Sequence, residues 1–200
     1  IQTIKVQSRF IEQTSYKAKN IEELFSHFAQ HDSKRYSVAW IDCTAKGIQL
    51  GRGILMTGDF AIDGDLQEKT SGVHSRLKIP FFLPSWIINP ISLKIFNTLY
   101  YHLTSVNDRK KVAVDFNTFF FPLDQILHWN RLYGKQGFLQ YQFVLPLEHS
   151  AVGIKKILNH ISDSGQGSPL AVLKLFGPEN DNYLSFPMEG FTLALDFKNQ

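Results

Sequence analysis

Residues Gly137–Pro146, with the sequence GFLQYQFVLP, read as a strand because they are rich in Tyr, Phe and Val. A helix is predicted directly after them, from Ser150 to Ser164, because apolar residues recur there at helical spacing. Gly165 follows at the position where a glycine commonly ends a helix. Strands are predicted next at Pro169–Phe176 and Gly190–Phe197. The last third therefore has the order β-α-β-β.

The first sixty residues predict the same order. Asn20, three residues before Glu23, is a plausible N-cap for a helix from Ile21 to Gln30. The strands expected around this helix are Thr3–Phe10, Arg35–Cys43 and Leu50–Thr57. Two such units, each resembling part of a ferredoxin-like fold, predict an α+β domain with a largely antiparallel sheet and helices on one face.

Between the two units lies a segment rich in proline and aromatic residues, Leu77–Tyr101. Its prolines exclude a long helix before residue 90, but a helix is expected at Ile91–Leu103 and another from Pro122 to about Tyr133. Two interpretations stay open. The segment is a helical insertion that packs on the sheet, or it is a lid that faces lipid or substrate.

The composition is that of a globular protein, with 200 residues, 44% hydrophobic and 20% charged. A net charge of +3 does not by itself imply nucleic acid as a partner. The single cysteine, Cys43, excludes a disulfide framework within the chain, and no run of 18 apolar residues occurs. Because Ile1 is not an initiator methionine, we expect residues 1–200 to be one domain cut from a longer protein.

The sequence does not contain complete motifs for dinucleotide, metal or RNA binding. Gly47, Gly51 and Gly53 precede a strand-like run instead of opening a helix, so they do not form a dinucleotide-binding fingerprint. His27 and His31 have the spacing of a metal pair, but no third ligand accompanies them, and we expect no metal site. The strand at 137–146 lacks the second aromatic residue of an RNA-binding strand, so nucleic acid is not expected either.

Polar residues recur on one face of three predicted strands, because alternate residues of a strand share a face. The other face of each strand is largely apolar and suits packing against helices. The mixed faces are Phe138, Gln140, Gln142 and Val144; Leu170, Val172, Lys174 and Phe176; and Tyr36, Val38, Trp40 and Asp42. Such a face is typical of a ligand surface, but it is also typical of the solvated side of an antiparallel sheet.

Lys174 is the most informative of these residues, because Leu173 and Leu175 flank it in an apolar run. An ammonium group in such a run must reach water, pair with an anion or meet a ligand, since burying it alone is costly.

Six segments resemble, in order and spacing, the FAD-linked oxidases of the vanillyl-alcohol-oxidase superfamily, in the decaprenylphosphoryl-β-D-ribose 2-oxidase branch. These segments are Tyr36–Asp42, Pro122–Asp124, Trp129–Gly134, Gly137–Pro146, Lys174–Pro178 and Leu184–Pro187. The resemblance covers nearly the whole chain. It implies that residues 1–200 are the substrate-binding, or cap, domain, and that FAD is bound mainly by segments outside this chain.

The same resemblance implies which residues line the pocket. They are Trp40, Phe120, Asn130, Gln140, Gln142, Leu170, Val172, Lys174 and Phe176. It implies a catalytic role for Lys174, a contact between Gln142 and the flavin, and apolar walls at Trp40, Phe120 and Phe176. Phe120 departs from the mycobacterial pattern, which has a tyrosine there, so one pocket hydroxyl is missing.

The activity implied for the intact protein is oxidation of a secondary alcohol, such as a lipid-linked sugar hydroxyl, to a ketone by hydride transfer to flavin. The implied partners are that substrate and the FAD-binding domain of the same polypeptide, with peripheral contact to a membrane. Its location would be cytoplasmic or peripheral to a membrane, and the fragment alone would be inactive. The alternative is a non-catalytic module that binds lipid, sugar or protein on the same sheet face.

Overall fold

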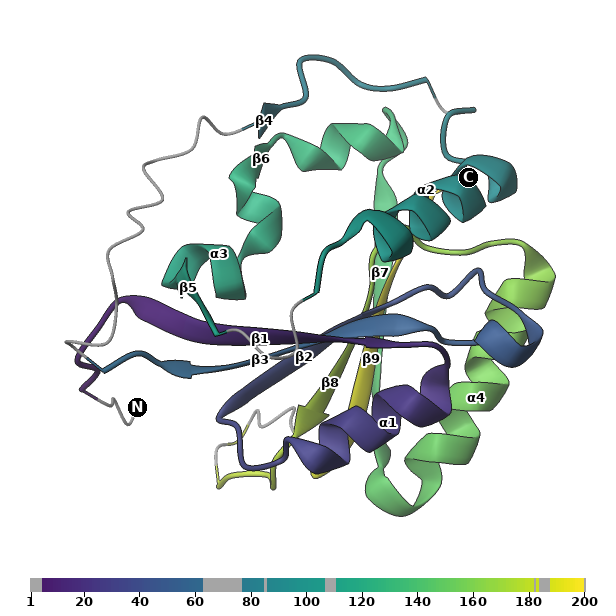
Figure 1. Ribbon diagram of the computed structural model, residues 1–200. Coiled ribbons are helices and arrows are strands. Elements are labelled where there is room, and N and C mark those ends of the chain that lie inside the picture. The colour runs from purple at the N-terminus through teal and green to yellow at the C-terminus, as the bar shows by residue number, and fades with distance from the viewer. Residues whose placement is uncertain are drawn as a thin grey trace.

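A seven-stranded antiparallel sheet, with the order β5-β1-β3-β2-β8-β9-β7, forms the centre of the protein (Figure 1). It is seen in a computed structural model that describes residues 5–62, 77–84, 86–106, 111–181, 183 and 188–199. In the described residues, four α-helices and three short 3₁₀ stretches lie around this sheet. The predicted α+β class with a largely antiparallel sheet is confirmed.

The first unit contains β1 (Phe10–Ala18), α1 (Ile21–Gln30), β2 (Tyr36–Ile41) and β3 (Gly53–Phe60). Helix α1 is as predicted, and the side chain of Asn20 accepts a hydrogen bond from the backbone N–H of Glu23 at 2.9 Å. In this position the side chain satisfies one of the amides that a helix start leaves unpaired.

Two strand boundaries of the first unit were predicted wrongly. A strand was expected at Thr3–Phe10, but β1 begins only at Phe10. Residues 5–9 are irregular, and Thr3 and Ile4 lie outside the described residues. Residues 12–17 are polar and half-buried, so the sequence there lacks the alternation of apolar and polar residues that predicts a strand. The strand expected from Leu50 begins at Gly53, because a 3₁₀ turn at Gly47–Gln49 occupies the preceding residues.

The second unit contains β7 (Phe138–Pro146), α4 (Leu147–Ser164), β8 (Ala171–Phe176) and β9 (Gly190–Lys198). Helix α4 begins three residues before the predicted start and ends, as predicted, at a left-handed Gly165 with φ 70°. Strand β8 lies between β2 and β9, so the two units join along the β2–β8 pairing.

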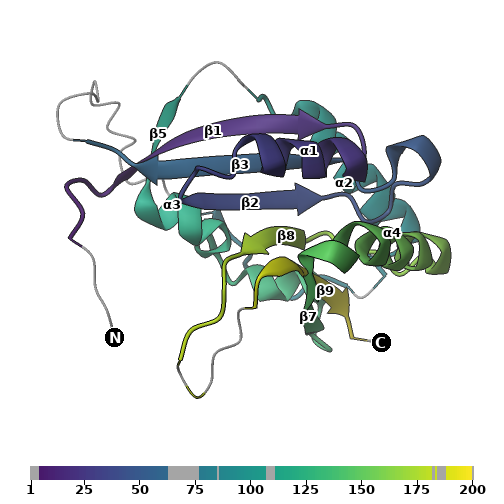
Figure 2. The same cartoon turned by 90° about the horizontal axis from the view of Figure 1, so that it is seen from below.

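Helices α1 and α4 cover one face of the sheet (Figure 2). The side chains between them and the strands form the main core, and the residues with full burial are Ala18, Leu24, Ala39, Ile41, Cys43, Leu55, Ile154, Leu158, Ala171, Leu173 and Leu193. These include Ala39 and Ile41 of β2 and Ala171 and Leu173 of β8, which confirms the predicted helix-covered face of those two strands. On β7 only Phe143 and Leu145 of the predicted face pack against this core, whereas Leu139 and Tyr141 are exposed, so the prediction is wrong for the first half of that strand.

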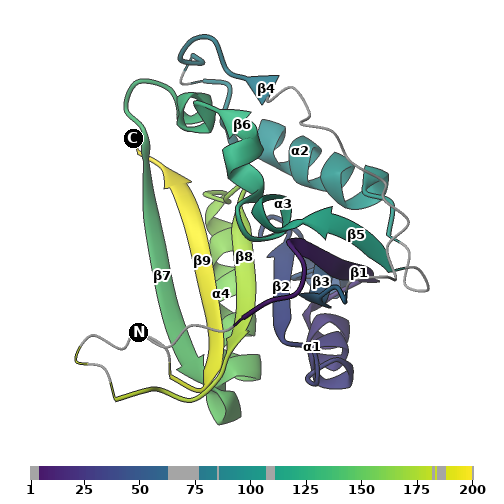
Figure 3. The same ribbon diagram turned by 90° about the vertical axis from the view of Figure 1, so that its left-hand side faces the viewer.

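The segment between the units lies largely against the second face, opposite α1 and α4 (Figures 1 and 3). It contains α2 (Pro90–Leu103) and α3 (Phe116–Phe120). Short strands complete it: β4 (Leu77–Lys78) pairs with β6 (Ile126–Leu127), and β5 (Val112–Asp115) pairs with β1 at the sheet edge. Helix α2 is packed on the sheet through Leu93 and Asn97, whereas Phe81, Phe82 and Trp86 are exposed, so a lid that faces lipid or substrate stays a prediction.

The predicted helix from Pro122 to Tyr133 is wrong. Two 3₁₀ stretches, η2 (Pro122–Gln125) and η3 (Trp129–Tyr133), flank the short strand β6. His128 takes a left-handed conformation with φ 60°, which interrupts a right-handed helix at that residue. Pairing of β6 with β4 uses backbone groups that a helix would need internally.

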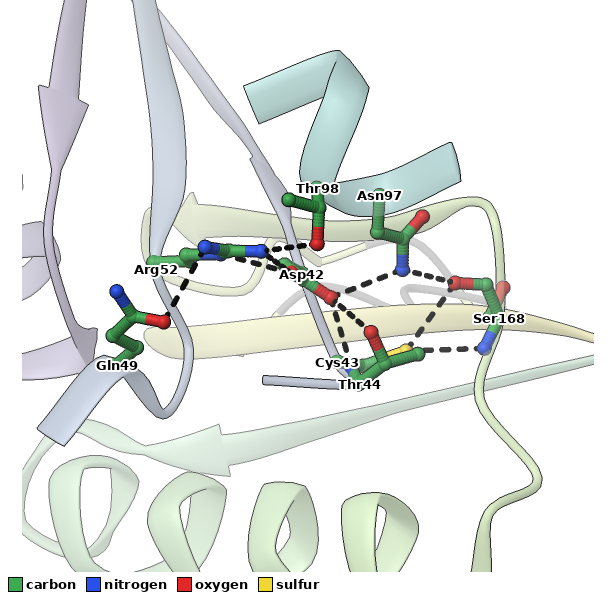
Figure 4. A network of polar contacts seen from close by, with 8 residues as sticks. All are labelled: Asp42, Cys43, Thr44, Gln49, Arg52, Asn97, Thr98 and Ser168. Carbon is green, nitrogen blue, oxygen red and sulfur yellow. Dashed lines mark hydrogen bonds and ion pairs between the residues drawn. The ribbon is translucent and has the colours of Figure 1, made fainter. Parts of the chain in front are cut away.

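A buried polar network fixes α2 to the sheet (Figure 4). Asp42, which is fully buried, pairs with Arg52 at 2.8 Å, and Arg52 also donates to the hydroxyl of Thr98 at 2.9 Å. Asn97 donates to Asp42 Oδ1 at 3.1 Å and to the backbone oxygen of Ser168 at 3.3 Å. One helix is thereby bonded to residues from both units.

Candidate functional site

Four residues from four adjacent strands lie side by side on the second face. Trp40 of β2 is opposite Val172 of β8, Val172 is opposite Ala194 of β9, and Ala194 is opposite Gln142 of β7. Directly opposed residues point to the same side of a sheet and lie about 5 Å apart. This cross-strand row is mainly apolar, with one amide at its end.

Polar groups flank this row on both sides. On one side, Gln140 is opposite Asp196, whose backbone N–H bonds to the backbone oxygen of Leu170 at 3.3 Å. On the other side, Lys174 is opposite Thr192. The central row and these two flanking rows, one with Gln140 and Asp196 and one with Lys174 and Thr192, form one continuous surface. The three rows bring together most of the residues predicted for the pocket.

Strand β9 supplies site residues that the sequence analysis missed. Thr192, Ala194 and Asp196 occupy the centre of the three rows, between β8 and β7. Their alternation with the buried Leu193 and Leu195 was visible in the sequence, and it could have placed them on the second face. Their central position, however, depends on the strand order, which the sequence does not reveal.

The amide groups of both glutamines are held by neighbouring side chains. Gln140 Nε2 donates to Asp196 Oδ1 at 2.7 Å, and Gln142 Nε2 donates to Thr192 Oγ1 at 3.0 Å. Burial raises the pKa of Asp196 above its usual range, and the hydrogen bond from Gln140 opposes that rise. The side chains of Gln140 and Gln142 otherwise remain exposed.

Lys174 is exposed on this surface. Among the residues that the structure describes, its ammonium group makes no hydrogen bond or ion pair. The charge is therefore available to an anionic group that approaches the second face.

Trp40 forms a fixed wall at the other end of the central row. Its ring is 5% exposed, its indole N–H donates to the backbone oxygen of Pro169 at 3.3 Å, and its centroid lies 4.6 Å from that of Tyr100 in α2. Leu170, directly before β8, and Phe176, its last residue, are both half-buried. These residues supply the apolar part of the surface.

Phe120 and Asn130, the remaining predicted pocket residues, come from the insertion and not from the rows. Phe120 packs edge-on against Tyr36 with ring centroids 4.8 Å apart, which places it over the start of β2. Asn130 is exposed on η3 and lines a shallow surface cavity of about 420 Å³ together with Asp124 and His128. The resembling segment Leu184–Pro187 lies outside the described residues.

The arrangement suits non-covalent binding of a ligand that is partly apolar and partly hydroxylated. Apolar walls, two oriented amides and one ammonium group converge on one open surface, as they do in ligand sites. Within the described residues, no group of three or more His, Cys, Asp or Glu could hold a metal ion. In the same residues, no helix is long and apolar enough to cross a membrane.

Comparison with known proteins finds a relative of known name. No protein-family model matches the chain. Over 168 residues, which are 81% of the chain, the sequence is 37% identical to decaprenylphosphoryl-beta-D-ribose oxidase of Mycolicibacterium smegmatis. The chain spans 36% of the length of that relative.

Proposed function

On the premise that this chain is a homologue of part of decaprenylphosphoryl-beta-D-ribose oxidase, we propose that it is the substrate-binding domain of an FAD-dependent oxidoreductase. The observation that carries this proposal is the set of three rows on the second face. Trp40, Val172 and Gln142 were singled out as pocket residues by sequence resemblance, and the fold places them on one surface.

The reaction we propose is oxidation of a secondary alcohol to a ketone. Bound FAD would supply the acceptor for the hydride of the carbinol carbon, and the hydroxyl proton would pass to a base or to solvent. The residues of this chain bind and orient the alcohol. Gln140 and Gln142 accept or donate hydrogen bonds at its polar side, and Trp40 and Val172 exclude water from its apolar side.

The donor set fits the ring of a flavin better than its diphosphate. A flat apolar row that ends in the Gln142 amide can lie against a heterocycle with polar edges. A diphosphate is typically bound at the N-terminus of a helix that follows a glycine-rich loop. The described helices that directly follow strands, α1, α3 and α4, begin after Asn20, Asp115 and Pro146 without such a loop. We therefore assign the diphosphate to a part of the protein other than the described residues.

Lys174 supplies the positive charge of the site. Its exposed ammonium group has no partner among the described residues, so a substrate phosphate or a developing alkoxide can pair with it. The printed name of the relative describes a phosphoryl pentose carried on a lipid. By analogy with that name, we propose a lipid-linked sugar phosphate as the substrate class.

The outer face of α2 supports contact with a lipid. Ile91, Ile95, Leu99 and Leu103 recur at four-residue spacing and are each at least half exposed. No acidic residue occurs from 77 to 106, whereas Lys78 and Lys94 do. An exposed apolar stripe with basic neighbours is typical of helices that lie on anionic lipid. We propose that this stripe meets the lipid part of the substrate or the membrane that contains it.

The test uses the full-length protein that carries this chain. Gln140→Leu and Gln142→Leu are each expected to lower kcat/KM by about tenfold to a hundredfold, since a lost polar contact costs about 1–3 kcal/mol. The same variants should lower kcat/KM more than stability, because both side chains are exposed. Gln140→Leu should destabilise the protein more than Gln142→Leu, since it removes the hydrogen bond to the buried carboxyl of Asp196. A protein that binds its ligand without flavin would instead support the alternative, a non-catalytic binding module.

A further inference from the structure

We propose that Asp196 is a positioning residue that turns the amide of Gln140 so that its carbonyl oxygen faces the ligand. The site then accepts a hydrogen bond from a ligand hydroxyl at this place, and it discriminates against ligands that lack that hydroxyl. This inference rests on the proposed function, because it concerns how the substrate of that same site is recognised.

Asp196 is well placed to hold Gln140. Its side chain is 1% exposed, and its Oδ1 lies 2.7 Å from Gln140 Nε2, in a directly opposed pair of β9 and β7. The backbone N–H of Asp196 is held in turn by Ser168 Oγ at 3.2 Å. The carboxyl group therefore has a fixed position, while the side chain that it bonds extends to the surface.

A carboxylate has no hydrogen to donate, so only the nitrogen end of the glutamine amide can face it. Even when Asp196 carries a proton on Oδ2, its Oδ1 remains an acceptor. Gln140 Oε1 is thereby turned away from Asp196. No described donor reaches this oxygen, so a hydroxyl of a ligand can donate to it.

Gln142 is oriented in the same sense by a different route. The hydroxyl of Thr192 donates its hydrogen to the backbone oxygen of Phe143 at 2.8 Å. That hydroxyl can then only accept from Gln142, which again leaves Oε1 of the glutamine for a ligand. The two glutamines, two residues apart on one strand, present two acceptors to one ligand. A sugar or other polyol has the donors to match them.

Asp196 also has a buried second oxygen. Its Oδ2 has no hydrogen-bond partner among the described residues. A carboxyl group of this kind is costly to bury and adds little to the fold by itself. Within the described residues, its one side-chain bond is to Gln140, which agrees with a role that acts through that glutamine.

The test measures substrate discrimination in the full-length protein. The probes are a short-chain isoprenyl phosphoryl-β-D-ribose and its analogues that lack one non-reacting hydroxyl each. The wild type should prefer the parent probe over one analogue by at least about tenfold in kcat/KM. Asp196→Leu should lose most of that preference, whereas Asp196→Asn, which keeps an acceptor oxygen, should retain it within about threefold.

A double-mutant cycle separates positioning from a merely structural role. Gln140→Met should abolish the preference by itself, and adding Asp196→Leu to it should change the preference no further. If Asp196→Leu slows the parent probe and every analogue equally, or if its effect on the preference is unchanged in the Gln140→Met background, the proposal is wrong.

A second measurement does not depend on the folding of Asp196→Leu or on activity. The side-chain amide resonance of Gln140, identified by its absence in Gln140→Met, should shift with pH as Asp196 titrates, and Asp196→Asn should abolish that shift. Among the described groups, Tyr133 interacts electrostatically with Asp196 and with Cys43, but burial raises the pKa of both Tyr133 and Cys43 far into the alkaline range. An amide that does not respond to pH overturns the inference. Failure of all probes to react, with the amide responding, would instead contradict the proposed function.

Discussion

At the scale of single residues, Lys174 separates a binding role from a structural one. Lys174→Met keeps most of the apolar stem and removes the charge. Because Lys174 is exposed and has no partner among the described residues, the substitution should cost less than about 1 kcal/mol, or roughly 2–4 °C in Tm. In the full-length protein we expect kcat/KM to fall at least about tenfold, equivalent to about 1.4 kcal/mol.

The matched control is Lys156→Met, an exposed lysine on α4 that lies on the helix-covered side of the sheet. It should change neither stability nor activity. Severe unfolding of Lys174→Met, with normal activity per folded molecule, would show that Lys174 is part of the fold and not of the site.

Cys43 predicts a dependence of stability on alkaline pH. Burial raises the pKa of its thiol from about 9 to about 12. A raised pKa in the folded state means that the contribution to stability is complete below pH 9 and is lost as pH rises from 9 toward 12. The free energy of unfolding of the wild type should fall faster over this range than that of Cys43→Ala, by up to about 1.4 kcal/mol per pH unit.

Denaturant unfolding of both proteins at several pH values from 8 to about 10.5 measures this difference. Parallel pH profiles for the two proteins would contradict it. Alkylation followed by peptide mapping gives an independent check, because the buried Cys43 should react only after unfolding.

The sequence predicted the position of single residues correctly where the two-residue alternation of a strand was enough to assign a side chain to one face of the sheet. The alternation around Gln140 and around Lys174 placed both on the face opposite the core, as the structure shows. It could not indicate that Asp196 would hold Gln140, because that contact depends on the register between β7 and β9. Whether the predicted residues act in catalysis stays a prediction.

At the scale of elements, α2 is held to the sheet by Asn97. Replacing Asn97 by Leu removes its bonds to Asp42 and Ser168 from a fully buried position. Because Asn97 Oδ1 has no partner among the described residues, part of that loss is offset. We expect a loss of about 1–2 kcal/mol in the free energy of unfolding.

Urea unfolding measures this loss, and Asn159→Leu on α4 is the control, since it makes the same change at an exposed helical position. It should stay within about 0.5 kcal/mol of the wild type. Equal effects of the two substitutions would mean that the network in Figure 4 does not stabilise the docking of α2.

Element prediction succeeded for helices with clear capping residues and failed where tertiary contacts decide. Helix α2 was expected at Ile91–Leu103, after the last of the three prolines, and the structure adds Pro90 in the first turn and a capping box between Asn89 and Ser92. The stretch from Pro122 to Tyr133 has helix-compatible residues, yet pairing of β6 with β4 divides it. That pairing joins residues about fifty apart in the sequence, which no local pattern reveals.

At the scale of the whole molecule, the second face resembles one half of a binding cleft. Gln140, Gln142 and Lys174 are exposed on it, and the chain spans 36% of the length of its relative. An open face of this kind, with exposed polar side chains beside an apolar row, cannot exclude water from a reaction by itself. A second wall must cover it. In our proposal, the FAD-binding part of the same polypeptide is that wall.

This division predicts that the 200-residue chain by itself folds but holds no flavin. Its core between α1, α4 and the sheet is complete without the second face, so unfolding should be cooperative. Purified alone, it should show no stoichiometric absorption band near about 450 nm, whereas the full-length protein should show one, because the cofactor carries the chemistry. Adding FAD to the isolated chain should produce at most weak binding, since one open face offers few contacts. A tightly bound flavin in the isolated chain would refute the assignment of these residues to the substrate-binding domain.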